Sequence, residues 1–173
     1  MNEAVAGQRG APGFSAAAAA RLIALLLPVA LLGGALGSQY LGGLHPCEMC
    51  YWQRWPHAAA IVLAALAFTA PAESGRSRTL TLVAALAIAI SGVIGVYHAG
   101  VEAKIFEGFT TCTALAKGLT PEEMLKAITH APLVRCDEVQ FRFLGISMAG
   151  WNAILSLGGA FAILLLSLRG QKR

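Results

Sequence analysis

Charged residues are scarce in this 173-residue chain. Only 13% of its residues are Asp, Glu, Lys or Arg, whereas 57% are hydrophobic. A soluble domain carries about 25% charged residues, so this composition excludes an ordinary water-soluble fold. The net charge of +4 arises from short basic clusters beside apolar runs, where membrane orientation or anionic lipid explains it better than nucleic acid. We therefore expect a protein that resides in a lipid bilayer and binds no nucleic acid.

Four segments lack Asp, Glu, Lys and Arg over a length that can cross a bilayer. A helix needs about 20 mainly apolar residues to cross a hydrocarbon core about 30 Å thick. Residues 22–44, 55–72, 79–100 and 147–168 meet this requirement. They predict an all-α integral membrane protein, with residues 1–173 forming one four-transmembrane-helix bundle. The first run also has features of a cleaved signal peptide, but its apolar character continues to Leu44, which favours a retained span.

The placement of lysine and arginine next to the spans predicts the orientation of the bundle. They precede the first span, fill the turn between the second and third spans, and follow the last span. Because basic residues favour the cytoplasmic side, both termini are expected to be cytoplasmic. The connections 45–56 and 101–146 are then expected to face outward. The basic residues concerned are Arg9, Arg21, Arg76, Arg78, Arg169, Lys172 and Arg173.

Cysteine is rare, and none occurs inside an expected span. Cys47 and Cys50 lie in the first outward connection, and Cys112 and Cys136 lie in the second. Random placement of four cysteines would put some of them into the spans or the inner turn. Their segregation predicts disulfide chemistry on the oxidising side of the membrane.

The two cysteine pairs differ in spacing and therefore in chemistry. Cys47 and Cys50 form a C-x-x-C, whose disulfide closes a small ring and whose dithiol can carry a depressed pKa. Such a pair favours thiol exchange over bracing. Cys112 and Cys136 enclose a loop whose closure stabilises a fold by about 3 to 4 kcal/mol in the chain-entropy model. A structural staple and a redox role fit this second pair equally well.

Two metal-based alternatives fit the cysteines less well. A four-cysteine zinc site would use the C-x-x-C as one half, but the second pair lacks the short spacing of zinc ligands. Attachment of a c-type haem needs histidine directly after the second cysteine, and position 51 is Tyr. We therefore expect no metal.

Two basic side chains near the outward ends of spans are candidate site residues. Arg54 follows Cys50 by four residues, so a helix that begins near Cys50 puts both on one face. A cation and a helix N-terminus both favour a thiolate at Cys50, whereas Glu48 opposes it. His98 lies at the end of the third span. Simpler interpretations, an arginine that extends to lipid headgroups and an interfacial histidine, stay open from position alone.

The second outward connection contains one predicted helix. It begins with a capping box that has proline at the first helical position, and apolar residues follow on one face. This pattern predicts a short amphipathic interfacial helix that rests on the membrane surface between the last two cysteines. The residues concerned are Thr120, Pro121, Glu123, Met124, Leu125 and Ile128.

The residues around the cysteines resemble those of the DsbB family, bacterial membrane oxidases that form disulfide bonds. The stretch 46–54, Pro-Cys-Glu-Met-Cys-Tyr-Trp-Gln-Arg, is similar to the signature of that family. The order and spacing of the cysteines fit as well, and the resemblance in layout extends over about residues 44–151. Its second half is carried by Cys136-Asp137-Glu138, Phe143-Leu144-Gly145, Met148 and Trp151.

This resemblance implies a four-helix bundle in the bacterial inner membrane, with the cysteine loops in the periplasm. It also implies a protein-dithiol:quinone oxidoreductase. Such an enzyme reoxidises a DsbA-like thioredoxin-fold protein and reduces ubiquinone or menaquinone. The implied partners are therefore a soluble dithiol protein, a lipid-soluble quinone and the bilayer itself.

The resemblance also implies roles for single residues. Cys112 would form the mixed disulfide with the DsbA-like partner, and Cys136 would be its pair. Cys47 would accept electrons from that pair, and Cys50 would face the quinone. Two further residues match family positions near the quinone ring: Arg54 and His98.

Two other functions fit parts of the sequence. An enzyme similar to vitamin K epoxide reductase shares the helix number and the C-x-x-C chemistry, but its C-x-x-C is expected late in the chain rather than after the first span. A non-enzymatic scaffold or small transporter with two structural disulfides is the second alternative. Redox titration separates these cases, because structural disulfides have potentials below about −300 mV.

Overall fold

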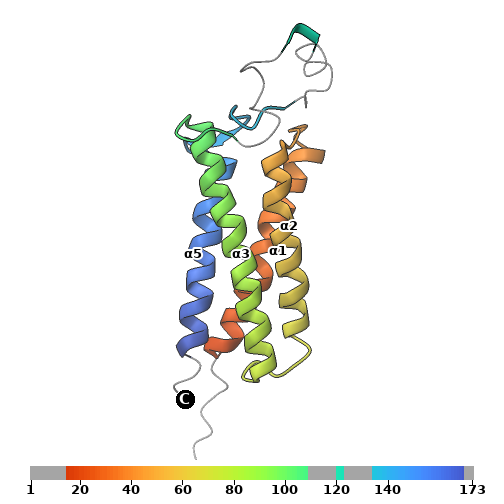
Figure 1. Ribbon diagram of the computed structural model, residues 1–173. Helices are drawn as coiled ribbons and strands as arrows, with labels where there is room; N and C mark the ends of the chain where they lie inside the picture. Colours follow the sequence, from red (N-terminus) through yellow and green to blue (C-terminus); the bar gives the residue numbers. More distant parts are fainter. Residues whose placement is uncertain (1–14, 109–119, 123–133, 170–173) are drawn as a thin grey trace, which may run out of the picture.

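The computed structural model describes residues 15–108, 120–122 and 134–169. Within these ranges four long helices run side by side (Figure 1): α1 (Ala16–Tyr40), α2 (Glu48–Ala67), α3 (Gly75–Glu102) and α5 (Met148–Arg169). A short hairpin of β1 (Arg142–Phe143) and β2 (Ile146–Ser147) precedes α5. The predicted helical class is therefore confirmed for the described part of the chain.

Three of these helices, α1, α3 and α5, are long and apolar enough to cross a membrane. They confirm the prediction of a membrane-embedded chain. Helix α2 falls short because its first turns carry Glu48, Gln53 and Arg54 and because the helix already ends at Ala67. The fourth span, 55–72, is therefore not confirmed and stays a prediction.

Two predictions for the second outward connection lie largely outside the described residues. Of the expected interfacial helix, only Thr120, Pro121 and Glu122 are described, and Pro121 and Glu122 are helical. Cys112 falls in the range 109–119, which the structure does not describe. The surface helix and the placement of Cys112 stay predictions.

Polar side chains set the starts of α1 and α3, so these helices extend beyond the apolar runs. Ser15 Oγ accepts a hydrogen bond from the backbone N–H of Ala18 at 3.1 Å, and Ser74 Oγ accepts one from Ser77 at 3.2 Å. Helix α1 ends at Tyr40, shortly before Gly43, whose φ of +67° leaves the helical region. Helix α1 therefore differs from the predicted span 22–44 at both ends.

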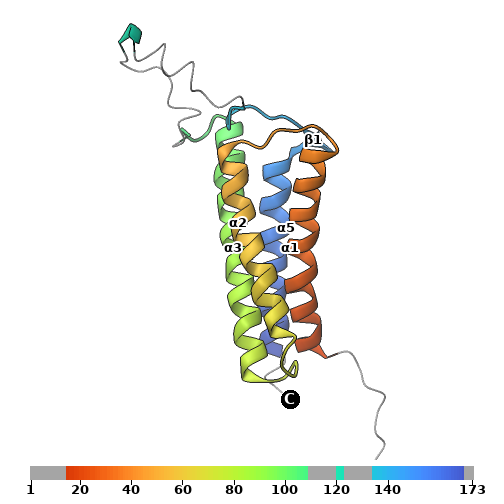
Figure 2. The ribbon, with the colours of Figure 1, turned by 90° about the vertical axis from the view of Figure 1, so that its right-hand side faces the viewer.

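Small residues allow the helices to approach one another closely. A cluster of buried residues fills the half of the bundle that contains the α2–α3 turn (Figure 2), which we call the inner half. Nearer the other end, a Cβ atom on Gly95 of α3 would lie 3.1 Å from Ala149 O and Ala153 N of α5. Such close backbone approach is typical of membrane helices. The inner cluster comprises Ala20, Ala24, Ala60, Ala64, Ala84, Ala85, Ile88 and Ile163.

The hairpin shapes the outer end of the bundle. Leu144 and Gly145 form its two-residue loop with φ angles of 51° and 80°, the geometry that two-residue hairpins prefer. Trp151 of α5 donates a hydrogen bond from Nε1 to Phe143 O at 2.9 Å. This bond ties the hairpin to the first turn of α5, so the chain that follows Cys136 is held over the outer end.

Candidate functional site

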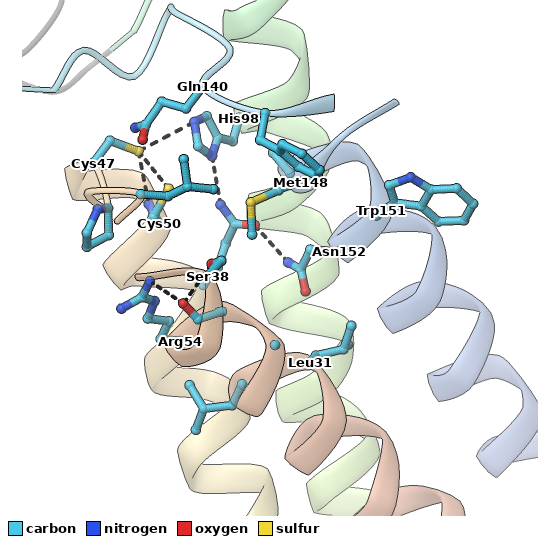
Figure 3. A pocket seen from close by; sticks show the side chains of 18 of the residues that line it. Leu31, Ser38, Cys47, Cys50, Arg54, His98, Gln140, Met148, Trp151 and Asn152 are labelled. Carbon is cyan, nitrogen blue, oxygen red and sulfur yellow. Dashed lines mark hydrogen bonds between the residues drawn. The ribbon is translucent and has the colours of Figure 1, made fainter. Parts of the chain in front are cut away.

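A cavity of about 630 Å³ lies at the outer end of the bundle and is lined by residues of all four long helices (Figure 3). Helix α2 contributes Cys50, Gln53, Arg54 and His57, which recur at helical spacing and so share one face. Apolar walls with a few converging polar groups are typical of a small-molecule site. The wall from α1 is small and mainly apolar, with Ala30, Leu31, Leu32, Gly34, Ala35 and Ser38.

Cys47 and Cys50 lie at the N-terminus of α2, where their sulfur atoms are 2.9 Å apart. Cys47 is the N-cap residue, because its Sγ accepts a hydrogen bond from the backbone N–H of Cys50 at 3.3 Å. The C-x-x-C spacing is thus also the spacing between an N-cap and the third helical residue. Cys47 is buried, whereas Cys50 is half-buried, and both line the cavity.

Cys136 is brought to the same place from the far end of the sequence. It is buried and belongs to a small cluster with Cys47, Met49 and Val101. The thiols of Cys136 and Cys47 form a hydrogen bond. Cys47 therefore contacts one cysteine from each predicted pair.

Of the Cys47–Cys50 pair, Cys47 holds its thiol proton more strongly. Hydrogen bonds to Cys136 and Cys50, together with burial, raise the pKa of Cys47. The hydrogen bond from Cys47 is the main cause that lowers the pKa of Cys50, and Arg54 adds a smaller effect of its charge. Cys50 is therefore the first of the two thiols to form a thiolate. The sequence argument weighed Arg54 and the helix end against Glu48 and left the net effect open, whereas the structure makes the neighbouring thiol the main cause of the lowered pKa of Cys50.

His98 of α3 faces Cys47, and Gln53 sets the orientation of its ring. Gln53 Nε2 donates to His98 Nδ1 at 2.8 Å, so the neutral ring carries its proton at Nε2. His98 Nε2 lies 3.6 Å from Cys47 Sγ and 3.9 Å from a carboxylate oxygen of Glu102. Figure 3 shows His98, Cys47 and Cys50 together at the same end of the cavity.

Arg54 extends toward α1, where its guanidinium group forms hydrogen bonds with two residues of that helix. Its Nη1 donates to Gln39 Oε1, and its Nη2 donates to Ala35 O at 3.2 Å. The guanidinium carbon also lies 5.2 Å from the centre of the Tyr51 ring. Arg54 Nε is buried, lacks a hydrogen-bond partner among the described residues and belongs to a side chain that lines the cavity. That N–H is a donor available to a ligand.

The same groups come close enough to raise the question of a metal. The sulfurs of Cys47 and Cys50 and a ring nitrogen of His98 all lie within 4.8 Å of one another, and such groups can bind zinc. However, Gln53 donates to Nδ1 and thereby leaves the ring proton on Nε2, the nitrogen nearest the sulfur. The arrangement therefore favours hydrogen bonding and thiol exchange over metal binding.

Ion pairs hold the segment that carries Cys136. Asp137 accepts hydrogen bonds from Arg135, at 2.8 and 2.9 Å, and from Lys104 Nζ at 2.6 Å. The Arg135 guanidinium, followed by Lys104, lowers the pKa of the Asp137 carboxyl. Because Lys104 directly follows the C-terminus of α3, these contacts attach the Cys136 segment to that helix.

A buried polar network next to the cavity was missed by the sequence analysis. His57 Nε2 lies 2.9 Å from Asn152 Oδ1 and 3.0 Å from Ser91 Oγ. Ser91 Oγ donates to Gln53 O at 2.8 Å, and Ser156 Oγ donates to Asn152 Oδ1 at 3.0 Å. The available signal was the presence of polar residues inside apolar spans, where they are costly unless they are paired.

Comparisons with known proteins show which proteins the chain is similar to. Residues 17–166 match the family described as disulfide bond formation protein DsbB. A disulfide bond formation protein B of Methylococcus capsulatus is 33% identical over 149 residues, which cover 83% of this chain and 90% of that protein. One of Xanthomonas oryzae pv. oryzae is 26% identical over 142 residues, which cover 79% and 82%. An uncharacterised protein of Rickettsia prowazekii is 22% identical over 139 residues, 79% of each chain. No solved structure gives a significant match.

Proposed function

The chain belongs to the DsbB family of disulfide bond formation proteins, and from this membership we propose that it passes electrons from a DsbA-like dithiol protein to a membrane quinone. The membership itself makes the chain a membrane oxidoreductase of disulfide bond formation. One observation carries the finer proposal: Cys47 contacts both Cys136 and Cys50, and Cys50 lines an apolar cavity. The cysteine of the outer loop and the cavity are thereby joined by a short series of sulfur contacts.

The first step of the proposed relay is exchange with the soluble partner. A thiolate of the partner attacks Cys112 in a Cys112–Cys136 disulfide, which forms a mixed disulfide and releases Cys136 as a thiolate. This step rests on the family resemblance, because Cys112 lies outside the described residues. Cys136 supports it by being buried beside Cys47, which is the next sulfur in the proposed order.

The second step is attack of Cys136 on Cys47 in a closed Cys47–Cys50 disulfide. A Cys47–Cys136 bond forms, and Cys50 leaves as a thiolate. Thiol exchange is faster when the leaving thiol has a low pKa. The pKa of Cys50 is lowered and that of Cys47 is raised, so attack at Cys47 expels the better leaving group. The second thiol of the partner displaces Cys112 from the mixed disulfide, which leaves the partner oxidised and Cys112 as a thiolate. Cys112 then attacks Cys136 in the Cys47–Cys136 bond and releases Cys47, so the Cys47–Cys50 pair is left reduced.

The residues around the cavity fit a quinone as the final acceptor. A bound quinone supplies a two-electron acceptor more oxidising than the DsbA couple, which lies at about −120 mV. The small residues of α1 leave room for an apolar ring, and the unpaired Nε of Arg54 can donate to a carbonyl oxygen. The Arg54 charge stabilises negative charge on that oxygen. His98 holds a proton at Nε2 beside Cys47.

The Cys50→Ser variant tests the proposal. Purified full-length protein in lipid nanodiscs is mixed with a reduced DsbA-like protein and decylubiquinone, and quinone absorbance is followed. Wild type should reduce the quinone, whereas the variant should not exceed the rate without enzyme. Mass mapping after alkylation should find Cys47 as a free thiol in the variant, because position 50 no longer provides the disulfide that Cys136 attacks.

Two results would contradict this function. Quinone reduction by Cys50→Ser at the wild-type rate would remove Cys50 from its terminal role. If the wild-type protein reacts with the dithiol partner but neither reduces nor binds decylubiquinone, the quinone is not its electron acceptor. Wild type incubated without partner is the matched control, since it contains quinone and enzyme but lacks the electron donor.

A further inference from the structure

His57 is a buried histidine with one ring nitrogen unused. The side chain is 3% exposed and lines the cavity. Its Nδ1 is buried and lacks a hydrogen-bond partner among the described residues. A buried polar atom without a partner costs about 1 to 3 kcal/mol, so such an atom beside a cavity points to a ligand that satisfies it.

The network around His57 fixes which nitrogen is available. Asn152 Nδ2 donates to Gln53 Oε1 at 2.8 Å and to Ser91 O at 3.2 Å, both of which only accept. The Asn152 Oδ1 atom is therefore an acceptor, and His57 Nε2 donates to it at 2.9 Å. Neutral His57 thus carries its proton at Nε2 and a free lone pair at Nδ1. A second proton can be held only at Nδ1.

The position of His57 matches the length of a quinone head group. His57 follows Cys50 by two helical turns on the same face of α2, which is about 10 Å along the axis. A benzoquinone ring with a hydrogen bond of about 2.8 Å at each carbonyl oxygen covers a comparable length. One carbonyl would lie beside Cys50 and Arg54, and the opposite carbonyl would then lie beside His57.

We propose that His57 Nδ1 binds the deeper oxygen of the quinone and supplies one of the two protons needed to form the quinol. This inference rests on the proposed function. In its protonated form Nδ1–H donates to the carbonyl oxygen, and in its neutral form Nδ1 accepts a hydrogen bond from the quinol hydroxyl. His57 therefore has a complementary partner before and after the transfer.

Formation of the quinol takes one proton more than the cysteine pair supplies. Closing the Cys47–Cys50 disulfide from one thiol and one thiolate releases two electrons and one proton, whereas a quinol carries two electrons and two protons more than a quinone. The Cys47 thiol accounts for one proton, and His57 accounts for the other. The groups bonded to His57 are all neutral, namely Asn152, Ser91 and Ser156. The charged and titratable residues on the same cavity wall are His45, Cys47, Cys50, Arg54, His98, Glu102 and Glu138.

Two substitutions separate a ligand-binding role from a structural one. The amide of Gln reaches the position of a histidine Nε2, so His57→Gln keeps the bond toward Asn152 and loses Nδ1. The amide of Asn reaches the position of Nδ1, so His57→Asn keeps the group that faces the ligand and loses the bond to Asn152. Binding of decylubiquinol is measured for the full chain in nanodiscs by quenching of tryptophan fluorescence, since Trp151 lines the cavity.

The proposal expects weaker binding only where Nδ1 is lost. His57→Gln should raise the Kd for decylubiquinol about tenfold, while its thermal midpoint stays at the wild-type value. His57→Asn should bind within about threefold of wild type despite a lower thermal midpoint. Ser156→Ala, which removes a network hydroxyl without touching Nδ1, should leave the Kd within about twofold.

The opposite pattern would overturn the inference. If His57→Gln binds decylubiquinol as tightly as wild type while His57→Asn does not, His57 serves only the network. The Cys50→Ser result separates this failure from failure of the proposed function. Wild type that binds decylubiquinol and reduces the quinone keeps the function intact whatever His57 does. If wild type binds no quinol, both the proposed function and the role of His57 are contradicted.

Discussion

The inner and outer halves of the bundle use small residues for opposite purposes. In the inner half, alanines of α1, α2 and α3 meet around Ile88 and Ile163, and the helices close on one another. In the outer half, Ala30, Gly34 and Ala35 of α1 face polar residues of α2 across a cavity. Small side chains thus allow tight helix packing at the inner end and leave space for a cavity at the outer end. The difference arises because the neighbouring helix presents alanines at the inner end and polar residues at the outer end.

The inner half contributes mainly to stability, whereas the outer half carries the reactive groups. Apolar packing in the inner half does not depend on the redox state of any cysteine. The outer half instead buries thiols, imidazoles and amides that need partners, and such groups are costly when they lose them. Changes in the inner half should therefore alter stability first, and changes in the outer half should alter reactivity first.

The largest expected effect is the loss of stability caused by a substitution in the inner half. Ala64 is fully buried in the alanine cluster, so Ala64→Leu forces extra volume between closely packed helices and should destabilise the protein by about 1 to 3 kcal/mol. The measurement is the thermal midpoint of purified protein in nanodiscs. Ala65→Leu is the matched control, because the neighbouring Ala65 is exposed. Equal midpoints for the two variants would contradict the close packing of the inner half.

A second prediction sharpens the contrast within the outer half. In the reduced protein, Cys50 should be alkylated by iodoacetamide at least about tenfold faster than Cys47 at pH 7, since each unit of pKa difference changes the thiolate ratio tenfold. The pKa of Cys50 is lowered, so its rate should stay high until the pH falls below that pKa. The pKa of Cys47 is raised, so its rate should stay low up to pH 9.

The shape of the pH profile separates acidity from access in this experiment. Burial alone slows Cys47 by the same factor at every pH, whereas a raised pKa shifts its profile to higher pH. The urea-unfolded chain is the matched control, and there both cysteines should follow one profile near the ordinary thiol pKa of about 8.5. Coincident profiles in the folded protein would contradict the assignment of Cys50 as the first of the two to form a thiolate.

The smallest expected effect concerns the rim of the outer half. Asp137→Asn removes the ion pairs with Arg135 and Lys104, which lie at the surface and should contribute less than about 1 kcal/mol. Because the pKa of Asp137 is lowered in the fold, its contribution is present above the unfolded pKa of about 3.9 and is lost as the pH falls further. The difference in thermal midpoint between wild type and variant should stay constant from pH 7 to about pH 4 and should narrow between pH 4 and pH 3. A constant difference down to pH 3 would contradict this linkage.

The sequence predicts features that depend on neighbours in the chain. Three apolar runs correspond to α1, α3 and α5, because membrane crossing depends on a continuous local property. The C-x-x-C is equally local, and its spacing already suggested exchange. The hairpin before α5 was missed, although Leu144-Gly145 provides the two-residue loop that it needs.

Features that depend on distant contacts were not predictable. The raised pKa of Cys47 depends on Cys136, which comes from another loop. The sequence argument considered only Cys50, where it weighed Arg54 and the helix end against Glu48. His57 is a single polar residue in an apolar segment, and its importance arises only from Asn152 and Ser91 on two other helices. Pairing of this kind is a property of the assembled bundle rather than of any one segment.

The N-cap role of Cys47 links the start of α2 to the redox cycle. In the Cys47–Cys136 disulfide of the proposed relay, the sulfur of Cys47 would no longer cap α2. The backbone N–H of Cys50 would then lose its hydrogen-bond acceptor. Loss of an N-cap costs about 1 kcal/mol, so the Cys47–Cys136 intermediate of the proposed relay would be destabilised by about that amount. In the proposed relay, the first turn of α2 would therefore favour return of Cys47 to its position beside Cys50.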